Sequence, residues 1–399
     1  MKLKSYLKLF KISNIDFSKE IGISSVSLSR YISGERLPEK KILNKIFKLT
    51  DGLVDANDFF LSSSPSRDLS EIHKEEIKKM VLNIREGKLK DLAKAITLVE
   101  SSLKLHNAQA DFLLSKLKQN KNSLRIGITG VPGVGKSTFI ETFGMSLIDL
   151  GFKVAVLAID PSSKRTGGSI LGDKTRMMKL SVNKNAFIRP SPSQGNLGGV
   201  AKKTSESIRC LEEAGFNIIF IETMGVGQAE TTVYDMVDIF LVLLLPSGGD
   251  ELQGIKKGII EMADVIIINK ADGNLKNTAE ITMLEYKNAQ NMISNIREDI
   301  SPEVFLCSST ESIGITKIWN FIKKFEKIRR DSGSFYKTRI QQQTKAIWRN
   351  IFLQSQDYIE NNLKYKDSVK KIIKDVEKNN FDVNNASKII FDSILKRNT

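Results

Sequence analysis

The residues with the clearest chemical meaning form a glycine-rich run that ends in a lysine and two hydroxyl side chains. The run is Gly130-Val-Pro-Gly133-Val134-Gly135-Lys136-Ser137-Thr138, a full match to GxxxxGK[ST]. Glycines let the backbone curl so that N–H groups and a helix N-terminus face a phosphate. Lys136 adds a positive charge for the β- and γ-phosphates, and the Ser137 hydroxyl can bind Mg²⁺. The run therefore predicts a nucleoside triphosphate site, with Lys136 as a catalytic residue.

A second motif points to the base of that nucleotide. Asn269-Lys270-Ala271-Asp272 matches NKxD and directly follows an apolar run at 265–268. The Asp272 carboxylate can accept two hydrogen bonds from guanine, from N1–H and the exocyclic amine, whereas adenine has no donor at N1. Two such bonds are worth about 3–6 kcal/mol, which predicts GTP and GDP rather than adenine nucleotides. Ser308 and Ser309 follow another apolar run and can place backbone N–H groups beneath guanine O6.

Acidic residues between the two motifs predict a magnesium site. Glu222 ends an apolar run in Glu222-Thr-Met-Gly225, where many GTPases have Asp-x-x-Gly, and Asp160 and Asp173 follow the preceding run. Three carboxylates near one triphosphate require a cation between them. Each acid taken alone could instead cap a helix or lie in a solvated loop. Gln228 could orient the attacking water, or be an ordinary polar loop residue.

These motifs need a scaffold, and the apolar runs supply one. Runs typical of buried parallel strands occupy 124–129, 154–159, 218–221, 239–245, 265–268 and 304–307, and helical stretches alternate with them. This alternation predicts a doubly wound α/β domain over 121–330, with a mostly parallel sheet. Only helical patterns follow residue 325, at 340–356 and 368–395. A helical extension with a linker is expected over 63–120, where Leu89, Leu92, Ile96 and Val99 share one face.

The first 62 residues predict a separate helix-turn-helix domain. Gly22 lies at the expected turn, and apolar residues take the positions that pack the two helices together: Phe17, Ile21, Ile23, Leu28 and Tyr31. The second helix would turn Ser24, Ser25, Ser27 and Arg30 outward. This region resembles Cro and phage-repressor domains. Its outward face could contact DNA, or the three helices could form a docking module without a nucleic-acid partner.

The composition of the chain excludes several classes of protein. With 41% hydrophobic and 27% charged residues, the chain is not mostly disordered, and its apolar runs are too short for a membrane span. The formal charge of +15 is spread along the chain, so it reflects either general composition or a local basic binding face. Two cysteines, Cys210 and Cys307, cannot build a disulfide framework. We therefore expect a cytoplasmic protein with no membrane partner.

Longer segments resemble the MeaB/ArgK family of GTPases, which are associated with cobalamin-dependent acyl-CoA mutases. The similarity covers about residues 75–399, and the segments that carry it are residues 89–143, AIDPSSKRTGGSILGDKTRM (158–177), FIRPSPSQGNLGGV (187–200), IETMGVGQAE (221–230) and LLLPSGGDELQGIKKGI (243–259). Ser247-Gly248 departs from the Gly-Ala that is usual in the family, and residues 1–62 lie outside the similarity.

The resemblance implies a GTPase chaperone that gates cofactor delivery to methylmalonyl-CoA mutase and protects or reactivates that enzyme. It assigns Asp160, Asp173 and Glu222 to the magnesium site and implies that the helical tail, 331–399, is a homodimerisation arm. It also implies a mobile segment that couples nucleotide state to the mutase and contains Asp250, Glu251, Gln253 and Lys256. An alternative function is a nucleotide-gated, DNA-binding transcriptional regulator. A nickel metallochaperone is disfavoured because the chain has only two histidines and no paired cysteines.

Overall fold

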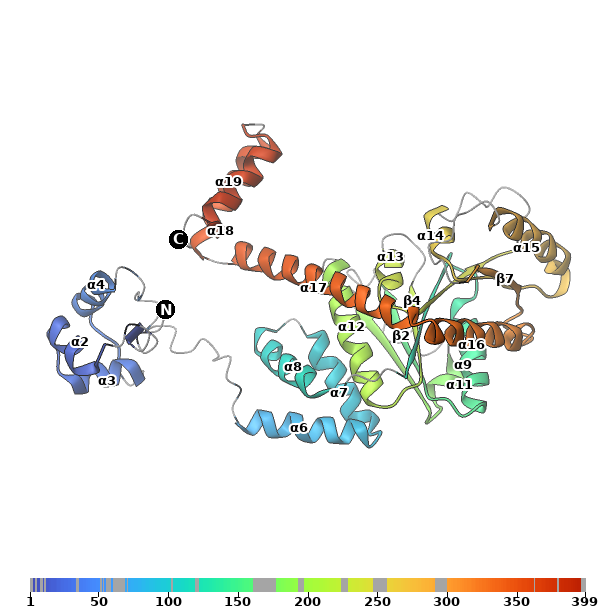
Figure 1. The fold of residues 1–399 in the computed structure, drawn as a ribbon, viewed down its shortest axis with the longest axis horizontal. Coiled ribbons are helices and arrows are strands. Elements are labelled where there is room, and N and C mark those ends of the chain that lie inside the picture. Colours follow the sequence, from blue (N-terminus) through green and yellow to red (C-terminus); the bar gives the residue numbers. More distant parts are fainter. Residues whose placement is uncertain are drawn as a thin grey trace. The chain divides into compact units, whose positions relative to one another are not determined.

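The computed structural model covers the 399-residue chain and divides it into two compact units, Met1–Lys74 and Glu75–Thr399. Both are shown in Figure 1 and are described separately below. The structure describes all residues except 1, 2, 4, 5, 8, 9, 11, 34, 35, 51, 53, 55–58, 60–68, 70, 102, 119–121, 161–176, 193–196, 224–228, 247–256, 291–299, 362, 379 and 396–399.

The first unit contains the predicted helix-turn-helix. Its helices are α2 (Asn14–Ile21), α3 (Ser25–Ser33) and α4 (Lys40–Leu49), drawn in blue in Figure 1. Gly22 ends α2 with φ 75°, a left-handed conformation, and its N–H donates to the Lys19 carbonyl. Phe17, Ile21 and Leu28 are fully buried between the helices, as their spacing predicts, and Ile23 is half-buried.

The second unit is built on a seven-stranded sheet. Its strands are β1 (Leu124–Gly130), β2 (Val154–Asp160), β3 (Ala186–Pro192), β4 (Ile218–Thr223), β5 (Ile239–Leu244), β6 (Val265–Ile268) and β7 (Glu303–Leu306). They lie in the order β3-β2-β4-β1-β5-β6-β7, and every neighbouring pair is parallel. The α/β prediction is therefore confirmed. Because all strands run the same way, their carboxyl ends meet at one edge of the sheet.

The sequence analysis did not predict one of the strands, β3. Strand β3 contains Arg189, Pro190 and Pro192, which interrupt the apolar run that marks a buried strand. Proline cannot donate a ladder hydrogen bond and is tolerated only where the strand has a neighbour on one side. β3 is such an edge strand, paired only with β2.

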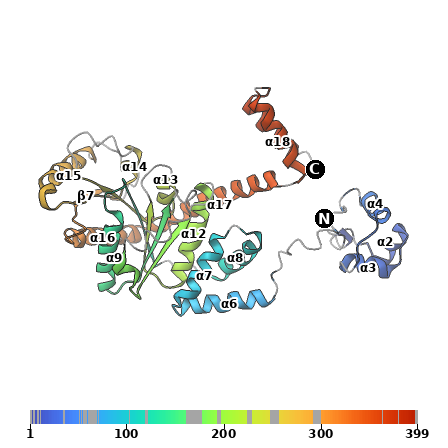
Figure 2. The ribbon, with the colours of Figure 1, turned by 180° about the vertical axis from the view of Figure 1, so that it is seen from behind.

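Helices cover both faces of the sheet. Figure 2 shows α9 (Lys136–Asp149) and α16 (Ile315–Asp331) on one side, and α12 (Leu197–Glu213) and α13 (Ala229–Tyr234) on the other. On the first side Phe143 packs against Phe220 and Trp319, with ring centroids 5.5 and 6.1 Å apart. The other helices described in this domain are α11 (Met178–Ser181), α14 (Lys257–Met262), the short η3 (Gly273–Leu275) and α15 (Lys276–Gln290).

Helical segments precede and follow the sheet. Helices α6 (Glu71–Arg85), α7 (Leu89–Glu100) and α8 (Lys104–Lys116) come first, and α7 and α8 pack on α12. After α16 come α17 (Ser334–Asn361), α18 (Leu363–Glu377) and α19 (Val383–Leu395). The predicted helical stretch 368–395 is thus two helices. Asp382 separates them because its carboxylate accepts the Asn384 and Asn385 N–H groups at 2.9 and 3.0 Å and so caps α19.

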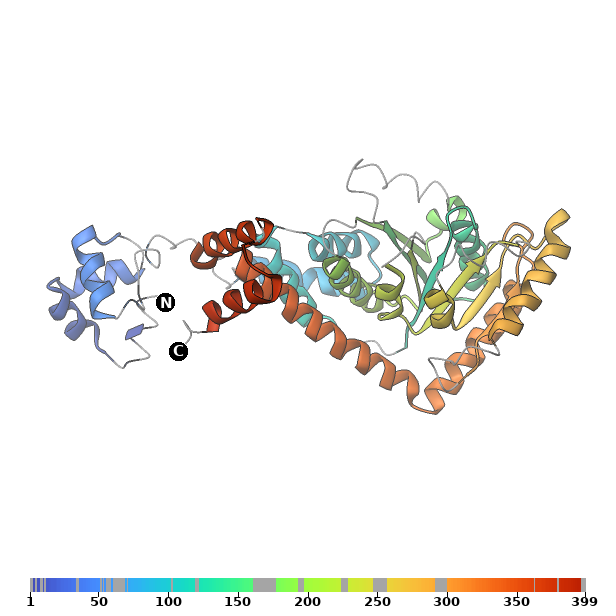
Figure 3. The same ribbon diagram turned by 90° about the horizontal axis from the view of Figure 1, so that it is seen from above.

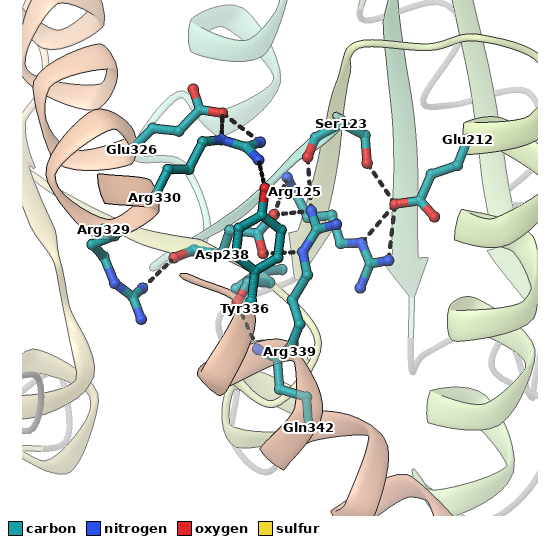
Figure 4. Close-up of polar contacts among 11 residues, drawn as sticks. Ser123, Arg125, Glu212, Asp238, Glu326, Arg329, Arg330, Tyr336, Arg339 and Gln342 are labelled. Atoms are coloured by element: carbon teal, nitrogen blue, oxygen red, sulfur yellow. Dashed lines mark hydrogen bonds and ion pairs between the residues drawn. The ribbon is translucent and has the colours of Figure 1, made fainter. Parts of the chain in front are cut away.

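A buried ion pair anchors α17 to the sheet. Helix α16 ends at a corner where Gly333 has φ 76°, and α17 leaves at a sharp angle (Figure 3). The Arg339 guanidinium donates to both oxygens of Asp238, at 2.8 and 2.6 Å (Figure 4). Burial alone would raise the pKa of Asp238, but Arg339, supported by the Arg125 charge and backbone N–H, holds that pKa below its ordinary value.

The ion pair is part of a larger polar network. Arg339 also donates to the Ser123 carbonyl at 2.7 Å, at the amino end of β1. Glu212 of α12 accepts from the Ser123 hydroxyl at 2.5 Å and from Arg125 Nε at 2.9 Å (Figure 4). The network therefore joins α17, α12 and the amino ends of β1 and β5. Among the described residues, no helix is both long and apolar enough to cross a bilayer.

Replacing Asp238 with Asn should destabilise the second unit by about 3–5 kcal/mol at neutral pH, because it leaves Arg339 buried without its counter-charge. The folded-state pKa lies below the ordinary value of 3.8, so the carboxylate contributes stability above about pH 4. That contribution is lost as the pH falls through the lowered folded-state pKa. Urea unfolding monitored by tryptophan fluorescence measures the effect, since both tryptophans, Trp319 and Trp348, lie in this unit.

Asp235→Asn is the matched control for that measurement. Asp235 pairs at 2.8 Å with Lys345, which is largely exposed, so its loss should cost less than about 1 kcal/mol. Equal costs for the two variants would contradict the assignment of Asp238 as the anchor.

Candidate functional site

The glycine-rich loop connects the central strand β1 to helix α9. Gly130, Gly133 and Gly135 have φ values of 152°, 82° and 94°, a region in which side chains are strained. Gly130 also lies so close to β5 that a Cβ atom would be 2.5 Å from the Leu243 carbonyl oxygen. The loop thus curls tightly at the carboxyl edge of the sheet.

Lys136 is the first residue of α9 and is held within the loop. Its Nζ donates to the carbonyls of Gly130 at 2.7 Å and Val131 at 3.2 Å, and the residue is 9% exposed. Ser137 and Thr138 follow in the first helical turn, where backbone N–H groups have no partner within the helix. A positive charge and a helix N-terminus thus meet at one point, as anion binding requires.

Glu222 lies at the end of β4, next to this loop. The Ser137 hydroxyl donates to Glu222 Oε1 at 3.3 Å, and Glu222 is nearly buried. Thr223, the next residue of β4, donates its hydroxyl to that of Thr129 on the neighbouring strand β1, at 2.8 Å. A carboxylate beside a hydroxyl suits Mg²⁺, which uses one or two carboxylates and completes its octahedral shell with waters and substrate phosphates. Within the described part of the chain no group of three or more His, Cys, Asp or Glu side chains gathers around a possible metal position.

Several predicted residues lie outside the described residues. Asp160 ends β2 at the same edge of the sheet, but its side chain is not described. The others are Asp173, Gln228, Asp250, Glu251, Gln253 and Lys256. Their predicted roles in metal binding, water orientation and partner coupling stay predictions.

Asn269 joins the base motif to the phosphate loop. Its Nδ2 donates to the Val134 carbonyl at 2.8 Å. Its Oδ1 accepts from the Ser309 hydroxyl at 2.7 Å and from the Ser309 N–H at 3.2 Å. Asn269 is 1% exposed, so its amide is fixed between two loops that are far apart in the sequence. The sequence motif predicted Asn269 at the site, but not this bridge.

The side chain of Asp272 accepts hydrogen bonds from the loop after β7. The Ser308 hydroxyl donates to Asp272 Oδ2 in a short hydrogen bond, and Thr310 Oγ1 donates to the same oxygen at 3.4 Å. Lys270, between Asn269 and Asp272, is exposed and has φ 59°, an unusual conformation for a residue with a side chain. The carboxylate has two oxygens and about four acceptor positions, so it can also receive two donors from a base. Thr310 was missed because no motif contains it.

The two cysteines take no part in this chemistry. Burial raises the pKa of the Cys307 thiol to about 12, and burial has the same effect on Cys210. Both are therefore protonated at neutral pH, and neither is a thiolate nucleophile.

On α3 of the first unit, the predicted outward residues differ in their contacts. Ser24 caps the helix, because its hydroxyl accepts the Ser27 N–H at 3.1 Å, and Ser27 is half-buried. Ser25 and Arg30 are exposed, and so is Val26, at 61%. The sequence analysis overlooked Val26 because it considered only polar side chains as outward residues.

Fold and loop together define a P-loop GTPase, and comparison with known proteins agrees. Residues 92–365 match the family described as methylmalonyl Co-A mutase-associated GTPase MeaB, and residues 3–52 match a helix-turn-helix family. GTPase ArgK of Escherichia coli is 45% identical over 277 residues, which are 69% of this chain and 84% of ArgK.

Two further proteins are similar. The mouse mitochondrial methylmalonic aciduria type A homolog is 44% identical over 294 residues, 71% of each chain. A crystal structure described as an LAO/AO transport system kinase superposes with a TM-score of 0.65 at 33% identity, and the match covers 82% of this chain and 99% of that one. The chain therefore belongs to the MeaB family of GTPases and carries an additional N-terminal helix-turn-helix domain.

Gly135→Ala tests the contact between the two loops. A Cβ atom at Gly135 would lie 2.8 Å from Asn269 Nδ2, and φ there is 94°, so the substitution should displace the bridging amide. We expect the affinity for GDP to fall at least about tenfold, since the buried amide and its partners lose about 1–3 kcal/mol. Competition against a fluorescent GDP analogue measures the loss.

Gly151→Ala controls for backbone strain. Gly151 has a similar φ, 89°, but a Cβ atom there would enter open space away from the loop. It should lose stability without losing GDP affinity. If both variants bind GDP like the parent chain, the bridge has no role in nucleotide binding.

Proposed function

We propose that the chain is a GTP-hydrolysing chaperone of a cobalamin-dependent acyl-CoA mutase, with methylmalonyl-CoA mutase as the expected client. The observation that carries the proposal is the family match over residues 92–365, a span that contains both the phosphate loop and the base motif. In this proposal GTP hydrolysis alters the segments beside the phosphate loop. Those segments change the grip on the mutase and thereby gate cobalamin loading, protection and reactivation.

Different described residues bind different parts of GTP. Lys136 and the N–H groups of the loop and α9 bind the β- and γ-phosphates. Asp272 accepts the guanine N1–H and amine, and Asn269 keeps the base loop next to the phosphate loop. A water attacks the γ-phosphorus, the bond to the β–γ bridging oxygen breaks, and GDP and phosphate leave without a covalent enzyme intermediate.

Ser137 and Glu222 would hold a magnesium ion, Ser137 through its hydroxyl and Glu222 through its carboxylate or a bound water. Their contact at 3.3 Å supports this assignment, and Asp160 at the end of β2 would add a further acid. When bound, the ion neutralises charge on the β- and γ-phosphate oxygens. Glu222, as the longer acid, reaches from a strand end where many GTPases have aspartate.

Asp272→Asn should exchange guanine for xanthine specificity. Asparagine presents an amide N–H₂ where the carboxylate accepted hydrogen bonds, so it repels guanine N1–H and the amine but can donate to the xanthine O2. GTP affinity should fall about a hundredfold or more, because two hydrogen bonds to a charged group are lost, and affinity for xanthosine triphosphate should rise. Competition with a fluorescent nucleotide measures both. An unchanged preference for GTP would show that Asp272 does not read the base.

The same variant tests whether the mutase is the client of the chain. The full chain and a purified cobalamin-dependent methylmalonyl-CoA mutase are mixed with GTP, GDP or no nucleotide, and the complex is measured by light scattering after size exclusion. We expect the apparent affinity to differ about tenfold or more between GTP and GDP, and Lys136→Ala to remove the difference. With Asp272→Asn, the response should follow the xanthosine nucleotides instead. If no nucleotide state yields a complex, the chaperone proposal is wrong.

We also propose that the chain forms a homodimer through its C-terminal helices. Helix α17 presents an apolar stripe to solvent, formed by Ile340, Ile347, Trp348, Ile351, Phe352 and Tyr358. Trp348 and Phe352 are each 69% exposed and lie one turn apart. Large apolar patches of this kind mark protein interfaces, and a second copy offers the same stripe for burial.

Trp348→Glu should convert the dimer to a monomer, because it places a charge in the centre of the stripe, and sedimentation velocity measures the outcome. Glu360→Gln is the control, since Glu360 is exposed on the same helix and lies neither three nor four positions from any residue of the stripe. The control should remain dimeric. A chain that is monomeric before any substitution contradicts the proposal.

A second function is supported by the helix-turn-helix match over residues 3–52 and by the exposed Ser25, Val26 and Arg30 on α3. In that alternative the GTPase domain controls a DNA-binding transcriptional regulator. Retention of one duplex sequence over others, with a steep salt dependence, would favour it. Nucleotide-dependent binding to the mutase without DNA retention favours the chaperone.

A further inference from the structure

Thr142 makes a contact that links the two halves of the nucleotide site. It lies in the second turn of α9, six residues after Lys136, which places it about 9 Å further along the helix axis. Its hydroxyl donates to the Ser309 carbonyl at 2.7 Å. Ser309 belongs to the loop after β7 that lies beside Asp272, so the helix that begins at the phosphate loop also holds the base loop.

That contact fixes the orientation of a backbone donor. The Ser309 carbonyl and the Thr310 N–H belong to one planar trans peptide, in which the C=O and N–H point in opposite directions. Holding the carbonyl against α9 therefore aims the Thr310 N–H away from α9. The Ser309 N–H is directed at Asn269 Oδ1, at 3.2 Å. The Thr310 N–H is thus the backbone donor whose direction Thr142 sets.

The rest of the loop is already fixed at its base. Ser308 and Ile313 exchange two backbone hydrogen bonds, both 3.1 Å long, and the Glu311 N–H donates to the Ser308 hydroxyl at 3.2 Å. The contacts also close a ring: Thr142 holds Ser309, Ser309 holds Asn269, and Asn269 holds Val134 in the phosphate loop. Thr142 and Val134, the first and last residues in this series of contacts, both belong to the segment that runs from the phosphate loop into α9, and the backbone between them closes the ring.

We propose that Thr142 is a positioning residue for base specificity: by holding the Ser309–Thr310 peptide, it presents the loop's backbone N–H to guanine O6. The proposal rests on the guanine site proposed above and adds a residue outside both nucleotide motifs. Thr142 does not touch the base itself. It acts through the Ser309 carbonyl, whereas Asp272 reads the opposite edge of guanine.

Nucleotide analogues can separate these two contacts. In 6-thioguanosine diphosphate a sulfur, a weak acceptor, replaces O6, whereas N1–H and the amine are retained. Inosine diphosphate keeps O6 but lacks the amine that Asp272 accepts. The affinity ratio of GDP to the thio analogue therefore reports on the loop after β7, and the ratio of GDP to the inosine nucleotide reports on Asp272.

The test compares Thr142→Val, which removes the hydroxyl at nearly constant shape, with Thr142→Ser, which keeps the hydroxyl. In Thr142→Val the ratio of GDP to the thio analogue should fall about fivefold, the effect of one neutral hydrogen bond, and the ratio of GDP to the inosine nucleotide should change less than about twofold. Thr142→Ser should retain both ratios. Ser146→Ala is the control on the same helix, because the Ser146 hydroxyl donates to the Phe143 carbonyl within α9, at 2.7 Å.

Three other outcomes would overturn the proposal, and each points to a different reason. Unchanged ratios in Thr142→Val show that the hydroxyl does not position the loop. A parallel fall of both ratios together with the melting temperature shows a general structural role. If the parent chain itself does not prefer GDP to the thio analogue, recognition of O6 by this loop fails first, independently of Thr142.

Discussion

The buried side-chain amide of Asn269 is the contact on which the geometry of the site depends. One end of the amide donates to the phosphate loop and the other accepts from the loop after β7. Because the amide is out of contact with water, releasing either end would leave a polar group unsatisfied, at a cost of about 1–3 kcal/mol. The two loops therefore keep a fixed separation before any nucleotide binds, and a nucleotide that spans them does not have to order them.

Strand β1 connects this site to the C-terminal helices. Its carboxyl end becomes the phosphate loop at Gly130, whereas its amino end carries Ser123 and Arg125 into the network around Asp238 and Arg339. Helix α12 takes part in the same network through Glu212 and also packs against α17. A seven-residue strand in the middle of the sheet is rigid, so the start of α17 has a fixed position relative to the phosphate loop.

The sequence analysis succeeded where local pattern and chemistry coincide. Six of the strands follow from predominantly apolar runs, since buried parallel strands require apolar side chains on both faces. It failed for β3, where prolines are tolerated only because the strand has a single neighbour. It also merged α18 and α19, because the cap formed by Asp382 depends on one side chain rather than on periodicity.

By itself, the sequence determined the phosphate loop, the NKxD motif, the parallel α/β architecture and the helix-turn-helix, because each is encoded in neighbouring residues whose spacing has a direct physical meaning. The tertiary structure alone decided which side chains from distant segments meet: Asn269 with Val134, Thr142 with Ser309, and Asp238 with Arg339. These pairs are separated by 135, 167 and 101 residues. No local pattern marks such pairs, since the partner of each polar group is chosen by the packing of helices against the sheet and by the need to satisfy every buried donor and acceptor.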